Sequence, residues 1–377
     1  MEKYKILENA RKAKTNQQRR RFLVGATAAT AAIAFAGQAA AKSLRLYTWP
    51  DYMGSATLEE FSAKTGIVVS TDAYENSDEM LHNIDSSDGQ YDILIASYDY
   101  VEEMIANNFL LPLDHSQIPN TVNLLPVFRD AIFDPGRRFS MPFLWGTQGI
   151  CYRKSAVTEN PDSWRILFES DAYSGRVALP GPDTLGLALK YLGYSYNSVD
   201  PVELDAAGEL LIRQKPHVKS FVGHDGIELL ANGDVDVTVG WNSEILGLME
   251  NHDDFGYRVP IEGSLVWQDC ICIPRTTANA VGAHTLLNHA LDARVSATIA
   301  EELWYATPNQ AALELLPDSY KKDHVIFPGM DIIGRCEPAL NLGEAGTQLR
   351  NRIWEKVTQA WKIYGMNRKI LTWLKKQ

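Results

Sequence analysis

Short apolar runs alternate with segments of helical periodicity along the chain from Leu44 to Leu111. The apolar runs are rich in β-branched and aromatic residues, which is typical of strands: LRLYTW, IVVSTDAY and YDILIAS. The segments that follow them carry apolar side chains at helical spacing: ATLEEFSAKTG, EMLHNIDSS and YVEEMIANNFL. Strands that alternate with helices build an open, mostly parallel sheet. The order of the elements therefore predicts an α/β fold.

A second α/β region runs from about Val177 to Trp241, and a long extended segment, MPFLWGTQGICYRK, precedes it. Further helices are expected around His284–Leu303, as one long helix, and over about Thr347–Leu374. No low-complexity linker separates the two regions, so we expect two lobes joined by crossing strands. The predicted lobe 1 combines residues 44–143 and 270–312, lobe 2 combines 144–269 and 313–360, and a basic C-terminal tail spans 361–377.

Residues 1–41 have the features of an export signal. Three consecutive arginines, Arg19 to Arg21, precede Phe22 and Leu23 in a close match to the twin-arginine signature. An Ala-rich apolar run follows, shorter than the roughly 20 residues of a membrane span, and GQAAAKS then offers an A-x-A cleavage site. An amphipathic or disordered N-terminal tail is the alternative. We therefore exclude this segment from the fold and predict a periplasmic protein exported by the twin-arginine route.

The charge of the remaining chain favours cationic ligands. The whole chain has a formal net charge of -11, but residues 1–41 are basic, and the rest carries 28 basic against 45 acidic side chains. An acidic surface is a poor partner for nucleic acid phosphates. It suits cations, although acidic surfaces also serve solubility. The four cysteines are predicted to be buried free thiols rather than a disulfide framework: Cys151, Cys270, Cys272 and Cys336.

Aromatic side chains and carboxylates recur at the predicted strand ends, where open α/β sheets bind their ligands. They are Trp49, Asp51 and Tyr52; Ser97 and Asp99; Asp183; Trp241 and Glu244; and Trp267 and Asp269. Aromatic faces attract an ammonium group, by roughly 0.5–2 kcal/mol per contact, and pack against methylene groups. Carboxylates accept charge-assisted hydrogen bonds from the ammonium protons. This inventory therefore predicts a pocket for an elongated alkyl ammonium ion.

Simpler structural roles exist for the same residues. Asp51 and Asp99 could cap the helices that follow them, and Glu244 could be a first-turn residue favoured by the helix dipole. Trp241 and Trp267 could be ordinary core residues. Catalytic readings have little support, because the chain contains no H-E-x-x-H, P-loop, G-x-G-x-x-G or G-x-S-x-G motif. We expect no catalytic residue, metal or cofactor, while an exported hydrolase with paired carboxylates stays open as an alternative.

The mature region resembles the periplasmic spermidine/putrescine-binding proteins of ABC importers. The resemblance rests on motifs that occur in the family's order: LYTWPDY, TDAYENSDEM, YDILIASYDYVEEM, MPFLWGTQGICY, LALKYLGYSYNS, VTVGWNSE, WQDCICIP and YATPNQAALELL. It implies a periplasmic binding protein-like fold of type II, in which two α/β lobes with open mixed sheets close over a ligand. It also implies ligand contacts from all the strand-end residues named above, with Tyr305 as an additional aromatic wall.

The same resemblance implies the partners and leaves the exact ligand open. A polyamine and a membrane permease with separate ATP-hydrolysing subunits are expected, with no nucleic acid, and the chain is expected to be monomeric. Pro50, Asp183, Glu244 and Pro180 depart from the family's residues at their positions. The particular polyamine is therefore not assigned, and an amino acid, a sugar, a metal chelate or another amine remains an alternative. The basic C-terminal tail could contact anionic lipid or the permease, or could simply be a solvated helix face.

Overall fold

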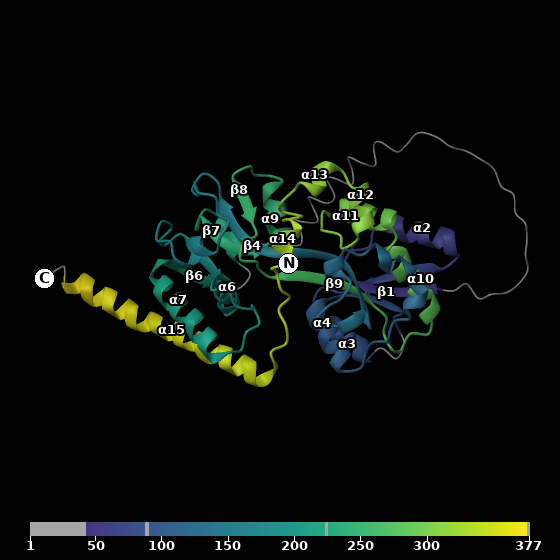
Figure 1. The fold of residues 1–377 in the computed structure, drawn as a ribbon, viewed down its shortest axis with the longest axis horizontal. Helices are drawn as coiled ribbons and strands as arrows, with labels where there is room; N and C mark the ends of the chain where they lie inside the picture. The colour runs from purple at the N-terminus through teal and green to yellow at the C-terminus, as the bar shows by residue number, and fades with distance from the viewer. Residues whose placement is uncertain (1–42, 87–89, 223–224, 375–377) are drawn as a thin grey trace, which may run out of the picture.

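The computed structural model describes residues 43–86, 90–222 and 225–374 (Figure 1). The strands are β1 Ser43–Thr48, β2 Val68–Ala73, β3 Ile93–Ser97, β4 Ser140–Arg153, β5 Val177–Pro180, β6 Val218–Val222, β7 Val237–Trp241, β8 Phe255–Arg258 and β9 Val266–Cys272. The helices are α2 Ser55–Thr65, α3 Ser77–Ser86, α4 Tyr98–Ala106, α5 Arg165–Phe168, α6 Thr184–Tyr191, α7 Pro201–Gln214, α8 Gly226–Ala231, α9 Asn242–Met249, α10 Ala280–Ala290, α11 Ala293–Leu303, α12 Gln310–Leu315, α13 Asp318–Lys321, α14 Met330–Ile333 and α15 Gly343–Leu374. The predicted signal, residues 1–41, lies outside the described residues, and so do the side chains of the predicted tail, 361–377.

The strands form one open sheet in the order β2-β1-β3-β9-β4-β7-β5-β6, with β8 paired to β4. The strands that alternate with helices pair in parallel, as β1 does with β2 and β3, and as β5 does with β6 and β7. The central strands β9 and β4 are antiparallel to their neighbours. The sheet is therefore mixed rather than mostly parallel, because two long strands cross between the two α/β units.

Strand β4 joins the two lobes. Its first half, up to Thr147, pairs with β9, and its second half, from Gln148, pairs with β7 and β8. Nearly all of its 14 residues are buried. In Figure 1, β4 and β9 run side by side through the middle of the molecule, with one α/β unit at each end. The predicted crossing segment is thus confirmed as a single continuous strand.

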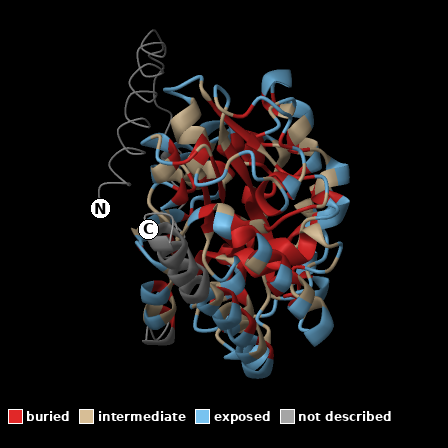
Figure 2. Ribbon diagram, turned by 90° about the vertical axis from the view of Figure 1, so that its left-hand side faces the viewer, coloured by how far each residue is buried: buried red, intermediate tan, exposed pale blue. Residues whose placement is uncertain are grey.

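Alternating side chains give each lobe a core on both faces of its sheet. In lobe 1, Leu44 and Leu46 of β1 pack with α2, α10 and α11, while Tyr47 packs on the opposite face with α3 and α4. In lobe 2, Val177 and Leu179 of β5 pack with α6, α7 and α15. The opposite face of lobe 2 is covered by α8 and α9. This pattern follows from the two-residue period of a strand, and Figure 2 shows the buried residues gathered in the interior.

Two helices replace the single long helix expected around His284–Leu303. Helix α10 ends at Ala290, and α11 begins at Ala293. Asp292 separates them, because its side chain accepts hydrogen bonds from the backbone N–H groups of Arg294 and Val295 and so caps a new helix.

The lobe boundaries drawn from the sequence remain a proposal. The boundary between residues 269 and 270 falls within β9, and because β9 pairs with β3 we describe the whole strand with lobe 1. A separate apolar cluster joins Leu316, Tyr320 and Ile326, which we assign to lobe 2, with Phe128 and Ala297 of lobe 1. The segment that follows lobe 1's last helices therefore packs close to the crossing strands. Among the described residues, no helix is both long enough and apolar enough to cross a membrane.

The four cysteines are free, as predicted. Cys151, Cys270 and Cys272 are buried, and Cys336 is half-buried. Burial raises the pKa of the Cys270 thiol to about 12, which keeps it protonated at neutral pH. These thiols are packing residues of the two cores.

Candidate functional site

Strand register brings the lobe 1 residues of the predicted site together. The parallel strands β1 and β3 end at Thr48 and Ser97, so the residues after them emerge at one edge of the sheet. The antiparallel strand β9 begins at this edge, and Asp269 lies directly opposite Ser97. Trp49 and Tyr52 follow β1, and Trp267 precedes Asp269 on β9. Positions far apart in the sequence are therefore neighbours.

Asp269 is a buried carboxylate with a tyrosine hydroxyl as its partner. Its side chain lies inside lobe 1, and Tyr52, which is also buried, donates a hydrogen bond to it. The pKa of Asp269 is raised to about 7, chiefly by burial; the hydrogen bond from Tyr52 lowers it in part, and the charge of Asp99 makes a smaller raising contribution. Burial and the Asp269 charge hold the pKa of Tyr52 well above its usual range. The proton of this pair therefore stays on the tyrosine.

Further aromatic rings pack beside Tyr52, the hydrogen-bond partner of this carboxylate. Tyr305 lies against Tyr52 with ring centroids 6.1 Å apart, and against Trp267 in an edge-on contact with centroids 5.6 Å apart. The ring of Trp49 packs on the ring of Tyr74, with the two ring centroids 4.4 Å apart. Trp49, Trp267 and Tyr305 are all only partly buried, and they pack against the lobe 1 core with part of their surface exposed to solvent. They therefore form a partly open aromatic wall rather than a closed core.

Asp99 adds a second carboxylate beside Asp269. It lies in the first turn of α4, is exposed, and accepts a hydrogen bond of 2.5 Å from the Ser97 hydroxyl. Its charge contributes to the raised pKa of Asp269, so the two carboxylates are close enough to repel each other. Asp99 does not cap α4, since Ser97 occupies the N-cap position. Two neighbouring anions in a partly buried setting favour a cation between them.

Asn242, at the start of α9, connects this wall to lobe 2. Its side chain is fully buried. The amide oxygen accepts hydrogen bonds from the Trp267 indole N–H at 3.3 Å and from the Thr147 backbone N–H at 3.2 Å. Trp241, the last residue of β7, comes directly before Asn242 and is partly buried against the lobe 2 core. The sequence places Asn242 at a strand end, but only the tertiary contact shows that it positions Trp267.

Asp183 belongs to the lobe 2 side of the predicted site. It is exposed at the N-cap position of α6 and makes no side-chain capping bond there. Its charge helps to raise the pKa of Tyr98, although burial is the larger cause and Asp99 contributes more. Tyr98 begins α4 of lobe 1, so the field of the Asp183 carboxylate reaches lobe 1 at the carboxyl end of β3. Contact of Asp183 with a ligand remains a prediction.

Two predicted residues differ from the rest in their surroundings. Glu244 accepts a hydrogen bond of 3.4 Å from the backbone N–H of Trp241, so its carboxylate serves the first turn of α9. Asp51 is exposed in a turn with left-handed backbone (φ 56°), and it does not cap α2, whose N-cap is Gly54. Both residues lie at the strand ends that the sequence indicated, and their contact with a ligand remains a prediction.

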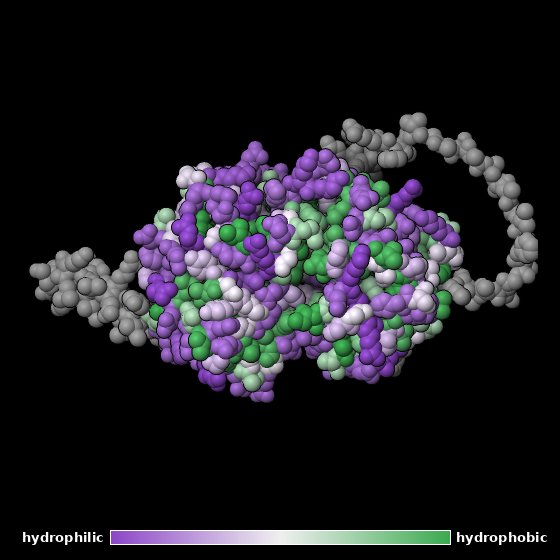
Figure 3. All heavy atoms as spheres, viewed as in Figure 1, coloured by the Kyte–Doolittle hydropathy of each residue, from purple (hydrophilic) through white to green (hydrophobic). Residues whose placement is uncertain are grey.

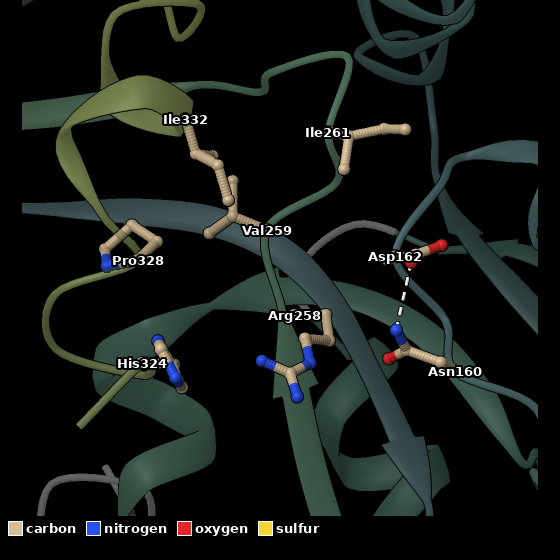
Figure 4. Close-up of a pocket in the computed structure, with 8 residues that line it drawn as sticks. All are labelled: Asn160, Asp162, Arg258, Val259, Ile261, His324, Pro328 and Ile332. Carbon is tan, nitrogen blue, oxygen red and sulfur yellow. Dashed lines mark hydrogen bonds between the residues drawn. The ribbon is translucent and has the colours of Figure 1, made fainter. Parts of the chain in front are cut away.

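The surface is indented between the two lobes in the space-filling view (Figure 3). A separate depression of about 180 Å³ lies at the junction of β8 with the segment around α14. Its lining includes Arg258, which points toward His324, and Asp162, which accepts a hydrogen bond from Asn160 (Figure 4). None of the predicted site residues lines it. Its mixed charges also differ from the acidic, aromatic character of the predicted site residues at the strand ends. We call these residues the strand-end cluster: Trp49, Asp51, Tyr52, Ser97, Asp99, Asp183, Trp241, Glu244, Trp267, Asp269 and Tyr305.

The strand-end cluster is suited to binding an organic cation. Asp269, Asp99 and Asp183 supply negative charge, and Trp49, Trp267 and Tyr305 supply aromatic faces. Within residues 43–86, 90–222 and 225–374, no three His, Cys, Asp or Glu side chains are grouped to hold a metal ion.

Comparisons with known proteins agree on one family. The sequence profile described as bacterial extracellular solute-binding protein matches residues 56–328. The spermidine/putrescine-binding periplasmic protein of Escherichia coli is 30% identical over 309 residues, which are 81% of this chain and 88% of that protein. The putrescine/agmatine-binding protein of Pseudomonas aeruginosa is 28% identical over 355 residues, 89% and 95% of the two chains. The structure of a spermidine/putrescine ABC transporter substrate-binding protein from Streptococcus pneumoniae superposes with a TM-score of 0.79 at 31% identity, covering 85% of this chain and 99% of that one.

Proposed function

The chain belongs to the family of bacterial extracellular solute-binding proteins, and we propose that its solute is a polyamine of the putrescine or spermidine class. The polyamine would be held in the cleft between the lobes and delivered to the membrane permease of an ABC importer. The relatives named above are described as binding spermidine, putrescine or agmatine. That agreement supports the ligand class and leaves the individual amine open.

The buried carboxylate of Asp269 carries the proposal. An ionised carboxylate that is taken out of water is costly unless it is paired. Tyr52 supplies one hydrogen bond but no positive charge. The pKa of Asp269 is raised because burial still disfavours the ionised carboxylate. An ammonium group that enters beside Tyr52 would supply the missing charge and donate charge-assisted hydrogen bonds. The site is therefore matched to a cation and mismatched to an anion.

The aromatic residues suit the rest of a polyamine. An alkyl chain between two ammonium groups packs well against tryptophan and tyrosine faces, which also attract the charges at its ends. Because Asp269 and Asp99 lie in lobe 1 and Asp183 in lobe 2, a ligand with charges at both ends would bridge the lobes. Closure of the lobes would then exclude water from the ion pairs. The distance between the carboxylates would select ligand length.

We propose these ligand contacts: Trp49, Asp51, Tyr52, Ser97, Asp99, Asp183, Trp241, Glu244, Trp267, Asp269 and Tyr305. We also propose that the protein is a periplasmic monomer exported by the twin-arginine route, and that it has no enzymatic activity. The family consists of solute-binding proteins, which supports the last point. A hydrolase acting through Asp269 would show turnover that the Asp269→Asn variant loses.

Native mass spectrometry of the freshly purified protein tests the ligand class. We expect a bound amine that is released by unfolding and identified by its mass. A thermal-shift screen on the stripped protein then compares putrescine, spermidine, agmatine and cadaverine with amino acids and sugars. Only amines should raise the melting temperature, and Asp269→Asn should abolish the rise. Asp205→Asn is a matched control, because Asp205 is exposed on α7 and pairs with the surface residue Lys356. Stabilisation by a sugar or an anion would contradict the proposal.

A further inference from the structure

Helix α15 places an arginine behind the Asp183 end of the proposed cleft. Arg350 is half-buried, and its guanidinium lies over the ring of Tyr196 at 5.6 Å from the ring centre. Its Nη2 atom donates to the backbone carbonyls of Tyr196 and Ser198, the second at 3.3 Å. Its Nε atom donates to the same Ser198 carbonyl at 3.4 Å. These bonds hold the guanidinium in one place on lobe 2.

Tyr196 connects this arginine to Asp183. Its ring is buried, and its hydroxyl donates a hydrogen bond of 3.5 Å to the backbone carbonyl of Asp183. The ring also packs so closely on Gly186 in α6 that a Cβ atom there would come within 2.3 Å of it. The first turn of α6, which begins after Asp183, is therefore locked against the turn that binds Arg350.

The guanidinium of Arg350 lies within electrostatic reach of Asp183. Burial lowers the pKa of Arg350, and the nearby Tyr196 and Asp183 oppose that shift. Arg350 is bonded to backbone carbonyls, which carry no formal charge. An arginine side chain stays protonated under all physiological conditions. The side chain of Asp183 is exposed, and Tyr196 connects its backbone to the turn that holds Arg350, which places a fixed cation on the lobe 2 side of Asp183.

We propose that Arg350 is a specificity-determining residue, whose fixed positive charge weakens ammonium binding at Asp183. The cleft would then favour amines held chiefly at Asp269 and Asp99 over amines that also place an ammonium at Asp183. This inference rests on the proposed polyamine-binding function. It assigns to α15, which lies outside the strand-end cluster, a direct effect on which amine the cleft prefers.

Calorimetric titration of the full chain with putrescine and spermidine tests the inference through Arg350→Gln, which keeps an amide donor but removes the charge. The amine that contacts Asp183 is identified as the one that Asp183→Asn weakens. Arg350→Gln should bind that amine about 2- to 5-fold more tightly, the size measured for charge pairs that are exposed at a protein surface. Arg350→Lys should resemble the wild type. Arg213→Gln, at an exposed position late in α7, controls for the change in net charge.

The double variant Asp183→Asn/Arg350→Gln separates electrostatics from structure. We expect no gain over Asp183→Asn alone, because the group through which Arg350 acts is gone. Equal weakening of both amines by Arg350→Gln and Arg350→Lys would indicate a structural role and overturn the inference. A gain that persists without Asp183, or no loss of either amine on Asp183→Asn, would overturn it as well. If the folded wild type binds no amine, the proposed function fails as well. The outcomes above differ from this one, because in each of them the wild type still binds an amine.

Discussion

The hydroxyl of Tyr52 donates a hydrogen bond to the carboxylate of Asp269, although the two residues are 217 positions apart in the sequence. Both side chains are buried in lobe 1, one after the first strand and one on the strand that returns from lobe 2. The bond fixes the carboxylate at the sheet edge where β1 and β3 end, and it supplies no positive charge to balance the carboxylate. The site therefore suits a cation, and cation binding depends on whether Asp269 is protonated.

Amine affinity should fall as the pH is lowered. The pKa of Asp269 is raised to about 7 in the ligand-free protein, so a proton must leave before an ammonium group pairs with it. Putrescine and spermidine keep their primary ammonium groups charged below pH 8, since such groups titrate near 10.4. We expect affinity to be level above about pH 8 and to fall by about tenfold per pH unit below pH 6. Titrations in buffers of different ionisation enthalpy should also show proton release at pH 6, and a flat profile without release would contradict this assignment.

The stability of the ligand-free protein should carry the opposite pH signature. The folded pKa of Asp269, about 7, lies above the ordinary value of 3.8, so the folded state holds more protons between these values. The protonated Asp269 side chain therefore stabilises the folded state. This contribution to the free energy of unfolding is fully present below pH 3.8 and is lost as the pH rises through 7. The Asp269→Asn variant lacks this loss and should gain about 2–4 kcal/mol relative to the wild type between pH 4 and pH 8. Urea unfolding at a series of pH values measures the difference, and parallel curves would refute it.

Removing the Tyr52 hydroxyl should shift the pH profile rather than abolish binding. The hydrogen bond from Tyr52 lowers the pKa of Asp269, so Tyr52→Phe should raise that pKa. We expect affinity about 3- to 10-fold weaker at pH 7 and a smaller loss at pH 9, since a hydrogen bond to a charged group contributes roughly 1.5–3 kcal/mol. Tyr173→Phe, which removes a half-exposed hydroxyl bonded to Glu159 in lobe 2, is the control. A loss that is equal at both pH values would mean that Tyr52 acts only by packing.

Gly146 lies where β4 passes from one lobe to the other, and it has no room for a side chain. A Cβ atom there would come within 2.3 Å of the Asn242 amide oxygen and 2.5 Å of the Trp267 indole nitrogen. Gly146→Ala should therefore break the Asn242–Trp267 contact, lower the free energy of unfolding by about 1–3 kcal/mol and weaken amine binding. Gly334→Ala is the matched control, because its nearest neighbour would be at 3.4 Å. Thermal unfolding and calorimetry measure both effects, and unchanged affinity in Gly146→Ala would exclude a role for this contact.

The features that could be predicted from the sequence are those that depend on local residue patterns. Periodicity located the strands, and the rule that ligands bind at strand ends selected Trp49, Ser97 and Asp269, which the register of β1, β3 and β9 brings to one edge. The break at Asp292 was missed, because a capping residue between two apolar helical segments does not interrupt their periodicity. The sheet is mixed because β4 and β9 cross between the lobes, and strand direction is not encoded in periodicity.

Other parts of the site depend on contacts between distant elements. Asn242 positions Trp267 through a hydrogen bond that joins α9 to β9, and Arg350 approaches Asp183 only because α15 folds back on lobe 2. Neither residue belongs to the repeated pairing of an aromatic with a carboxylate that identified the others. Glu244 is the opposite case. It lies at a strand end, as the pattern predicts, but its carboxylate accepts a hydrogen bond from the backbone at the start of its own helix.

The central claim is that the cleft binds a polyamine through Asp269, and isothermal titration calorimetry of the stripped wild-type protein at pH 8 tests it most directly. We predict saturable one-site binding of putrescine or spermidine, retained in Asp205→Asn and weakened at least 100-fold in Asp269→Asn. Folded protein that mass spectrometry shows to be free of ligand, and that gives no heat with either amine, would contradict the account.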